Sequence, residues 1–99
     1  MDRFSEMMSV AVREDPDGAF ELAVEPGAIQ PRGTLKARHI FVQAAGHAMY
    51  EGDWVAQMAR DVGFASGDEI RKYVSGEFTP SFRFCLRVRD LLIKRRSPR

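Results

Sequence analysis

Apolar residues follow two different spacings along this chain, and the change between them falls near residue 33. Before that point, Val10 and Val12 lie two positions apart, and so do Phe20, Leu22 and Val24. Such alternation is typical of a β-strand with one buried face. Beyond residue 33, apolar residues recur three and four positions apart, which indicates amphipathic α-helices.

A turn separates the two alternating segments. Residues 15–18 read Asp-Pro-Asp-Gly, in which proline suits the first corner of a type I turn and glycine suits the left-handed position after it. This turn would place Val12 opposite Leu22 and Val10 opposite Val24, so that the apolar side chains share one face. The pattern therefore predicts an N-terminal β-hairpin whose apolar face packs on the helices.

Four helices are expected in the remainder of the chain, over residues 34–49, 53–62, 66–75 and 79–96. Residues that commonly cap helix N-termini stand at each start, and the expected caps are Thr34, Asp53, Ser66 and Thr79. Ser66 with Glu69 matches a capping box, and Pro80 suits a first turn in which no backbone donor is needed. Gly46 lies inside the first of these helices, where it would allow another helix to approach closely.

Residues 61–81 have the outline of a helix-turn-helix. Gly63 and Gly76 lie where a left-handed residue ends a helix. Ile70 marks the buried side of the helix between them, and each residue turns the helix by about 100°. The side chains that then point outward are Asp68, Arg71, Lys72 and Ser75.

We expect a mainly α fold, with residues 1–99 in one domain. It would consist of a four-helix helix-turn-helix domain (34–99) preceded by an N-terminal β-hairpin and connector (1–33). The last helix carries apolar residues over a wide arc, so a second neighbour is expected to cover it, such as its own copy in a homodimer. One core is predicted to contain Val10, Val12, Phe20, Leu22, Ile40, Phe41, Met58, Ile70, Tyr73 and Leu86.

Composition excludes several classes of protein. With 44% hydrophobic and 29% charged residues, the chain resembles an ordinary globular domain, and no apolar run approaches the ~18 residues of a membrane span. The N-terminus shows no secretion signal and Cys85 is the single cysteine, so we expect a cytoplasmic protein without a disulfide and with an inert, buried thiol. His39 and His47 lack companion ligands, and no catalytic motif is visible, so neither a metal, a cofactor nor an enzymatic activity is expected.

Charge is distributed unevenly although the formal net charge is only +1. Residues 1–27 carry seven acidic and two basic side chains, whereas residues 69–99 carry nine basic and three acidic ones. A basic C-terminal third favours anionic partners, although a solvated face and a charged tail would give the same composition.

Two motifs resemble the lambda-repressor-like (Cro-type) helix-turn-helix family, in particular its antitoxin branch among phage or plasmid regulators. Residues 58–63 (Met-Ala-x-x-x-Gly) resemble the first motif helix and its turn. Residues 70–81 (Ile-x-x-Tyr-x-x-Gly-x-x-x-Pro-Ser) resemble the recognition helix, its stop and the next helix. The resemblance implies a helical domain that sets the helix 66–75 in the DNA major groove, often as a dimer.

Three features depart from that family. The turn over residues 63–67 is one residue longer than usual, and Trp54-Val55 stand where a polar phosphate ligand is common. Asp68 and Glu69 also place two negative charges near the expected phosphates. An acidic residue there can instead interact favourably with the helix dipole, or accept a hydrogen bond from the amino group of cytosine.

Two functional hypotheses follow. In the first, the protein is a sequence-specific regulator that binds double-stranded DNA. Base contacts would come from Arg71, Lys72, Ser75 and Asp68, and phosphate contacts from Arg83, Arg87 and the tail 94–96. Ser66, at the start of the recognition helix, is also expected to bind DNA. In the second, it is a small adaptor or inhibitor that keeps the helix-turn-helix shape, has no DNA-reading surface and binds a protein partner.

Overall fold

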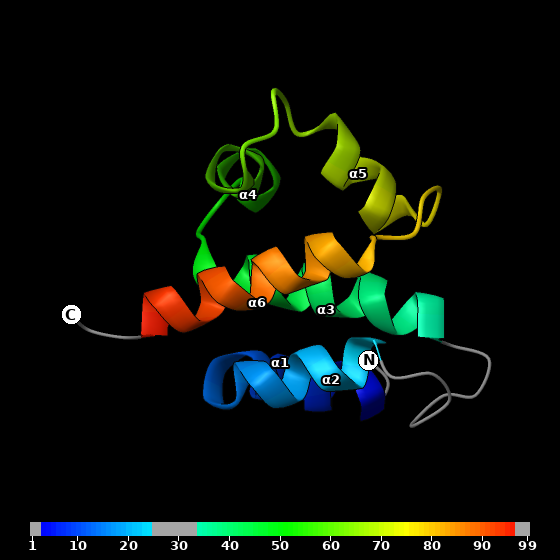
Figure 1. Ribbon diagram of the computed structural model, residues 1–99, viewed down its shortest axis with the longest axis vertical. Coiled ribbons are helices and arrows are strands. Elements are labelled where there is room, and N and C mark those ends of the chain that lie inside the picture. The colour runs from blue at the N-terminus through cyan, green and yellow to red at the C-terminus, as the bar shows by residue number, and fades with distance from the viewer. Residues whose placement is uncertain (1–2, 25–33, 97–99) are drawn as a thin grey trace.

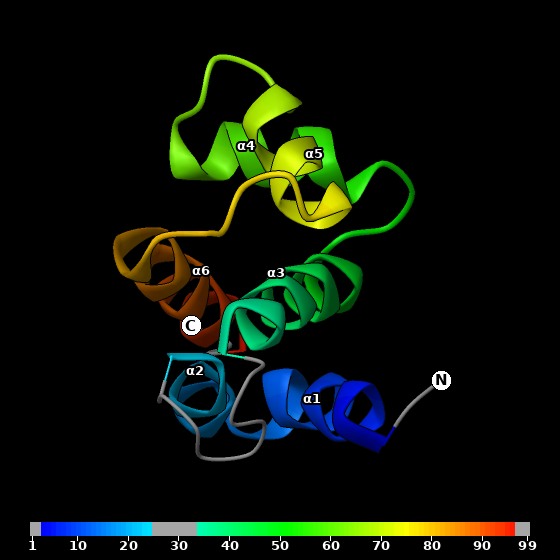
Figure 2. The ribbon, with the colours of Figure 1, turned by 90° about the vertical axis from the view of Figure 1, so that its right-hand side faces the viewer.

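The helices lie in three layers of two (Figure 1). This computed structural model describes residues 3–24 and 34–96, with side chains placed for 3–24 and 37–95. The helices are α1 (Arg3–Glu14), α2 (Pro16–Val24), α3 (Thr34–Met49), α4 (Trp54–Val62), α5 (Asp68–Ser75) and α6 (Phe82–Arg96). The pair α3 and α6 forms the middle layer, with α1 and α2 on one side and α4 and α5 on the other (Figures 1 and 2).

The predicted N-terminal β-hairpin is wrong, because α1 and α2 occupy those residues and the described part of the chain contains no strand. Phe4, Met8 and Val12 recur every four residues and are all buried, which is helical spacing. The alternating pattern rested on Val10 as an inward residue, yet 52% of its surface is exposed. The apolar residues from Phe4 onward therefore follow the helical period, and this segment folds as a helix.

The sequence Asp15-Pro16 starts a helix here instead of forming a hairpin turn. The Asp15 carboxylate accepts a hydrogen bond from the backbone N–H of Gly18 at 3.1 Å, as an N-cap does. Pro16 is the first residue of α2, where its missing N–H costs nothing and its fixed φ suits the helix. The predicted connector, residues 28–33, lies outside the described residues.

One hydrophobic core joins all six helices. Of the ten residues predicted for it, six are buried: Val12, Phe20, Phe41, Met58, Ile70 and Tyr73. Leu22, Ile40 and Leu86 pack partly buried against it. Gly46 lies in close contact with Trp54, because a Cβ there would stand 2.0 Å from the indole ring, so the predicted close approach of two helices is confirmed.

The second neighbour expected for the last helix is α2 of the same chain. Phe84, Cys85, Val88 and Leu92 of α6 are buried between the layers. Phe20 of α2 meets Phe82 of α6 edge to face, with ring centroids 5.3 Å apart. The wide apolar arc of α6 is therefore largely explained within one chain.

Helix ends agree with the sequence at glycine and differ at serine and threonine. Gly63 and Gly76 end α4 and α5 in the left-handed conformation, with φ of 91° and 88°, and Asp53 caps α4 as predicted. The capping box is wrong: α5 begins after Gly67, and Ser66 accepts a hydrogen bond only from the backbone N–H of Asp68.

The start of α6 also differs from the prediction. The Ser81 hydroxyl, rather than Thr79, accepts a hydrogen bond from the backbone N–H of Phe84 at 3.0 Å. Since α6 begins at Phe82, Pro80 belongs to the loop before the helix, where it is buried, instead of the first helical turn. The predicted Thr34 cap lies outside the described side chains. No helix in the described ranges is long and apolar enough to cross a bilayer.

Candidate nucleic-acid interface

The turn between α4 and α5 is fixed by aromatic packing on α6. Phe64, directly after the left-handed Gly63, stacks on Phe84 with ring centroids 5.6 Å apart and planes 16° apart. Phe84 in turn meets Tyr73 of α5 at 4.8 Å. Gly67 begins α5 so close to α4 that a Cβ there would lie 2.9 Å from Val55. Packing on α4 and α6, together with contacts to α3, therefore determines the orientation of α5.

The buried and exposed faces of α5 follow the helical period. Ile70 is fully buried and Tyr73 is nearly so. Asp68, Arg71 and Ser75 are exposed and Lys72 is half-buried, all on the side away from the core. In Figure 1, α5 lies at the outer edge of its layer. Ser66 is exposed in the turn just before α5.

Arg71 and Asp68, two of the predicted base-reading residues, form an ion pair. Their Nη1 and Oδ1 atoms are 3.1 Å apart, and 59% and 78% of the two side chains are exposed. An ion pair at such exposure contributes about 0–1 kcal/mol, so a nucleic acid can replace it at small cost. Ser75 is engaged locally, since its hydroxyl donates to the carbonyl of Lys72.

The loop that follows α5 is held by side chains of α3. Arg38 donates to the carbonyl of Pro80 at 3.0 Å, and Nε2 of His39 donates to the carbonyl of Phe78 at 3.0 Å. Lys72 places its ammonium 5.0 Å from the centre of the Phe78 ring, an attractive cation–π arrangement. The sequence does not predict these contacts, because no pattern along the chain signals side chain–backbone pairs some forty residues apart.

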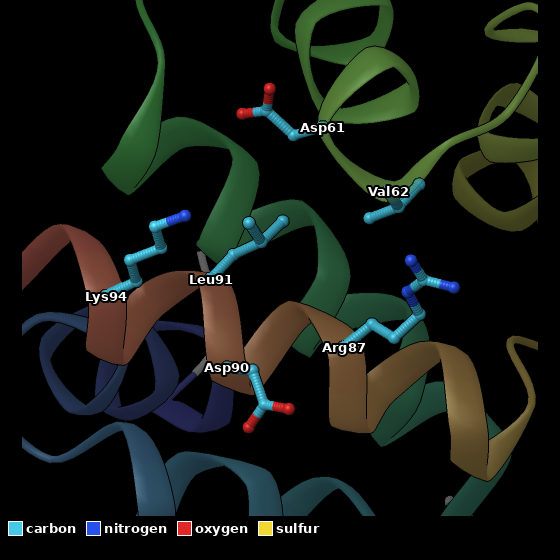
Figure 3. A pocket seen from close by; sticks show the side chains of 6 residues that line it. All are labelled: Asp61, Val62, Arg87, Asp90, Leu91 and Lys94. Atoms are coloured by element: carbon cyan, nitrogen blue, oxygen red, sulfur yellow. The ribbon is translucent and has the colours of Figure 1, made fainter.

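Arg83 and Arg87 lie one turn apart on α6, and both are exposed. Neither forms an ion pair within the described residues. Arg87 borders a groove of about 250 Å³ between α6 and the end of α4, and its guanidinium points toward Val62 (Figure 3). Asp61, Asp90, Leu91 and Lys94 complete the lining. Charges of both signs therefore share this groove, and it is no dedicated anion site.

Arg95, one of the tail residues 94–96 predicted to contact phosphate, makes contacts within the chain. Its guanidinium lies 4.9 Å over the Tyr50 ring and donates to the carbonyl of Met49, at the end of α3. The Tyr50 hydroxyl donates to Asp61 at 2.6 Å. Burial is the larger cause that raises the pKa of Tyr50, and the hydrogen bond to the Asp61 carboxylate is the second. Arg95 thus joins the ends of α3 and α6, whereas the side chain of Arg96 lies outside the described residues.

Groups suited to covalent or metal chemistry are scarce in the described chain. Cys85 is buried, as predicted, and burial raises the pKa of its thiol to about 12, so the reactive thiolate does not form near neutral pH. Among the described residues, no group of three or more His, Cys, Asp or Glu side chains is placed to hold a metal ion.

Comparisons of the chain with protein-family models, with curated proteins and with solved structures gave no match. The resemblance to lambda-repressor-like domains therefore rests on the residues 58–63 and 70–81 and on the fixed α4–turn–α5 unit that they form.

Proposed function

We propose that the protein is a sequence-specific DNA-binding regulator that places α5 in the major groove. One observation carries this proposal: α5 follows a turn fixed by Phe64 and Gly67, buries Ile70 and leaves Arg71 on its exposed face. Helices that read the major groove are held in place by one face and present polar side chains on the other.

Base reading is assigned chiefly to Arg71. A guanidinium that donates two hydrogen bonds to guanine O6 and N7 is the commonest specific contact in the major groove. The pair with Asp68 orients this guanidinium in the free protein. Once Arg71 contacts guanine, the Asp68 carboxylate is available to accept a hydrogen bond from the amino group of a neighbouring cytosine. Ser66, Lys72 and Ser75 border the same face.

Phosphate binding is assigned to Arg83 and Arg87. Both are exposed on α6, directly after the loop that follows α5. Phosphate contacts position a protein on the duplex without reading its sequence. Lys94, farther along α6, extends this row of cations.

A binding experiment tests the proposal. Selection of bound molecules from a random duplex pool should yield a preferred sequence. When the affinity for that duplex is measured at several salt concentrations, log affinity should decrease linearly with log salt concentration. With two phosphate contacts the slope should be about 1.8. Absence of binding to any duplex at low salt would refute DNA binding.

A second candidate function is protein binding, and one observation favours it. Phe78 lies in the loop after α5, Phe82 is the first residue of α6, and the two are 44% and 51% exposed. Exposed aromatic side chains of this kind are enriched in protein interfaces. If the loop serves a protein partner, binding should depend on Phe78 and change little with salt, in contrast to the DNA complex.

A further inference from the structure

Helix α1 exposes a complete face at the end of the molecule opposite α4 and α5 (Figure 2). Its inner side is anchored by Phe4, Met8 and Val12. Its exposed residues are Arg3, Glu6, Met7, Val10, Arg13 and Glu14. They recur with a spacing of three and four, so they form one continuous strip along the helix. Met7 and Val10, at 40% and 52% exposure, lie at its centre.

This strip is complementary to itself when two copies run antiparallel. If Met7 of one copy faces Val10 of the partner subunit, the same register places Arg3 opposite Glu14 of the partner subunit. Glu6 of one copy and Arg13 of the partner subunit then lie beside the apolar centre, on the same edge of the interface. In this register Arg3 pairs with Glu14 of the partner subunit and Met7 with Val10 of the partner subunit. Glu6 lies two positions out of register with Arg13 of the partner subunit, so these two are diagonal neighbours, as occurs beside the seam of an antiparallel coiled coil.

We propose that a second copy of this chain docks on the exposed face of α1 in antiparallel orientation. The charge order Arg3, Glu6, Arg13, Glu14 argues for this occupant, because a two-fold interface must be complementary to itself. A partner of uniform charge would meet repulsion at half of these positions. With two apolar side chains per copy, the interface is small, and we expect a weak, concentration-dependent dimer.

The proposed dimer would leave both copies of α5 uncovered. Since α1 and α5 lie in opposite outer layers, a dimer through α1 places its two α5 helices at far ends (Figure 2). Such a dimer presents α5 to two separate partners instead of to two half-sites on one duplex face. The inference concerns self-association alone, so it stands or fails independently of the proposed DNA binding.

Charge exchange tests the proposal by equilibrium sedimentation of the full chain without nucleic acid. The unmodified protein should dimerise with a dissociation constant of about 0.1–1 mM, the range of weak interfaces. Arg3→Glu or Glu14→Arg should each weaken dimerisation roughly tenfold, because like charges then face each other. The double variant Arg3→Glu with Glu14→Arg should recover the original constant, since opposite charges are restored.

Two further variants complete the experiment. Glu51→Lys reverses an exposed charge in the turn between α3 and α4 and should leave dimerisation unchanged. Val10→Lys should abolish it while the circular dichroism spectrum and the melting temperature stay close to those of the unmodified protein. A monomer at millimolar concentration, single reversals without effect, or a double variant that fails to recover would each overturn the proposal.

Discussion

The α1–α2 pair and the α4–α5 pair cover opposite sides of the same central layer, yet their sequences specify them by different means (Figure 2). In the second pair, Gly63 and Gly76 adopt a left-handed conformation that other residues avoid, so the helix ends are unambiguous. In the first pair, the junction is Asp15-Pro16, which suits a type I turn as well as the start of a helix. The sequence therefore predicts the helix ends at Gly63 and Gly76 more reliably than the structure at Asp15-Pro16.

The outer surfaces of the two pairs differ as well. The exposed face of α5 is polar and presents Arg71 beside Asp68. The exposed face of α1 has Met7 and Val10 at its centre, with charges of both signs around them. The first surface suits a polar, charged ligand such as DNA, and the second suits another helix.

The largest contrast between the two pairs should come from truncating one apolar residue in each. Ile70→Ala removes a fully buried side chain that docks α5, and should lower the free energy of unfolding by about 2–5 kcal/mol. Val10→Ala alters an exposed position on α1 and should change it by less than about 0.5 kcal/mol. Urea denaturation at low micromolar protein concentration measures both. A loss above 1 kcal/mol for Val10→Ala would favour the buried hairpin position over α1.

A smaller effect is expected where α3 meets α4. Gly46→Ala would place a Cβ against the Trp54 ring, which is itself buried, and overpacking of this kind costs about 1–3 kcal/mol. Gln43→Ala, on the exposed side of α3, is the matched control and should be nearly neutral. Thermal unfolding followed by circular dichroism compares the two. If Gly46→Ala stabilised the protein through its better helix propensity, the close approach of Trp54 would be incorrect.

The two N-caps offer a direct comparison between the pairs. Asp15 accepts a hydrogen bond at 3.1 Å from Gly18, and Asp53 accepts one at 3.4 Å from Ala56. Either change to alanine should cost about 0.5–2 kcal/mol, with a loss of helical ellipticity in both cases. An unchanged helical signal for Asp15→Ala would argue against a helix that starts at Pro16.

The start of α6 should give the smallest difference. Ser81→Ala removes the hydroxyl that caps the start of α6 through the backbone N–H of Phe84. It should lower the free energy of unfolding by about 1 kcal/mol. Thr79→Ala, at an exposed loop position, should stay within about 0.5 kcal/mol. Chemical denaturation of both variants decides which residue caps the helix, and a larger loss for Thr79→Ala would restore the sequence-based prediction.

How far the sequence predicts this protein depends on the kind of signal that each segment carries. The α4–turn–α5 unit and the outward direction of Arg71 followed from glycine positions and helical period, which are local. The N-terminal pair did not, because five alternating apolar residues over 10–24 fit a strand as well as parts of two helices. The contacts of Arg38, His39 and Arg95 depend on the packed fold, and no local pattern predicts them.

The central claim is that α5 reads bases, and one titration tests it directly. Fluorescence anisotropy would compare Arg71→Ala with the unmodified protein on the selected duplex and on a scrambled duplex. Arg13→Ala is the matched control, because Arg13 is exposed on α1 in the opposite layer. Arg71→Ala should cost about 1–3 kcal/mol on the selected duplex and reduce the preference between the two duplexes, whereas Arg13→Ala should change neither. Equal losses for both variants on both duplexes, or no loss for Arg71→Ala, would contradict the claim that α5 reads DNA.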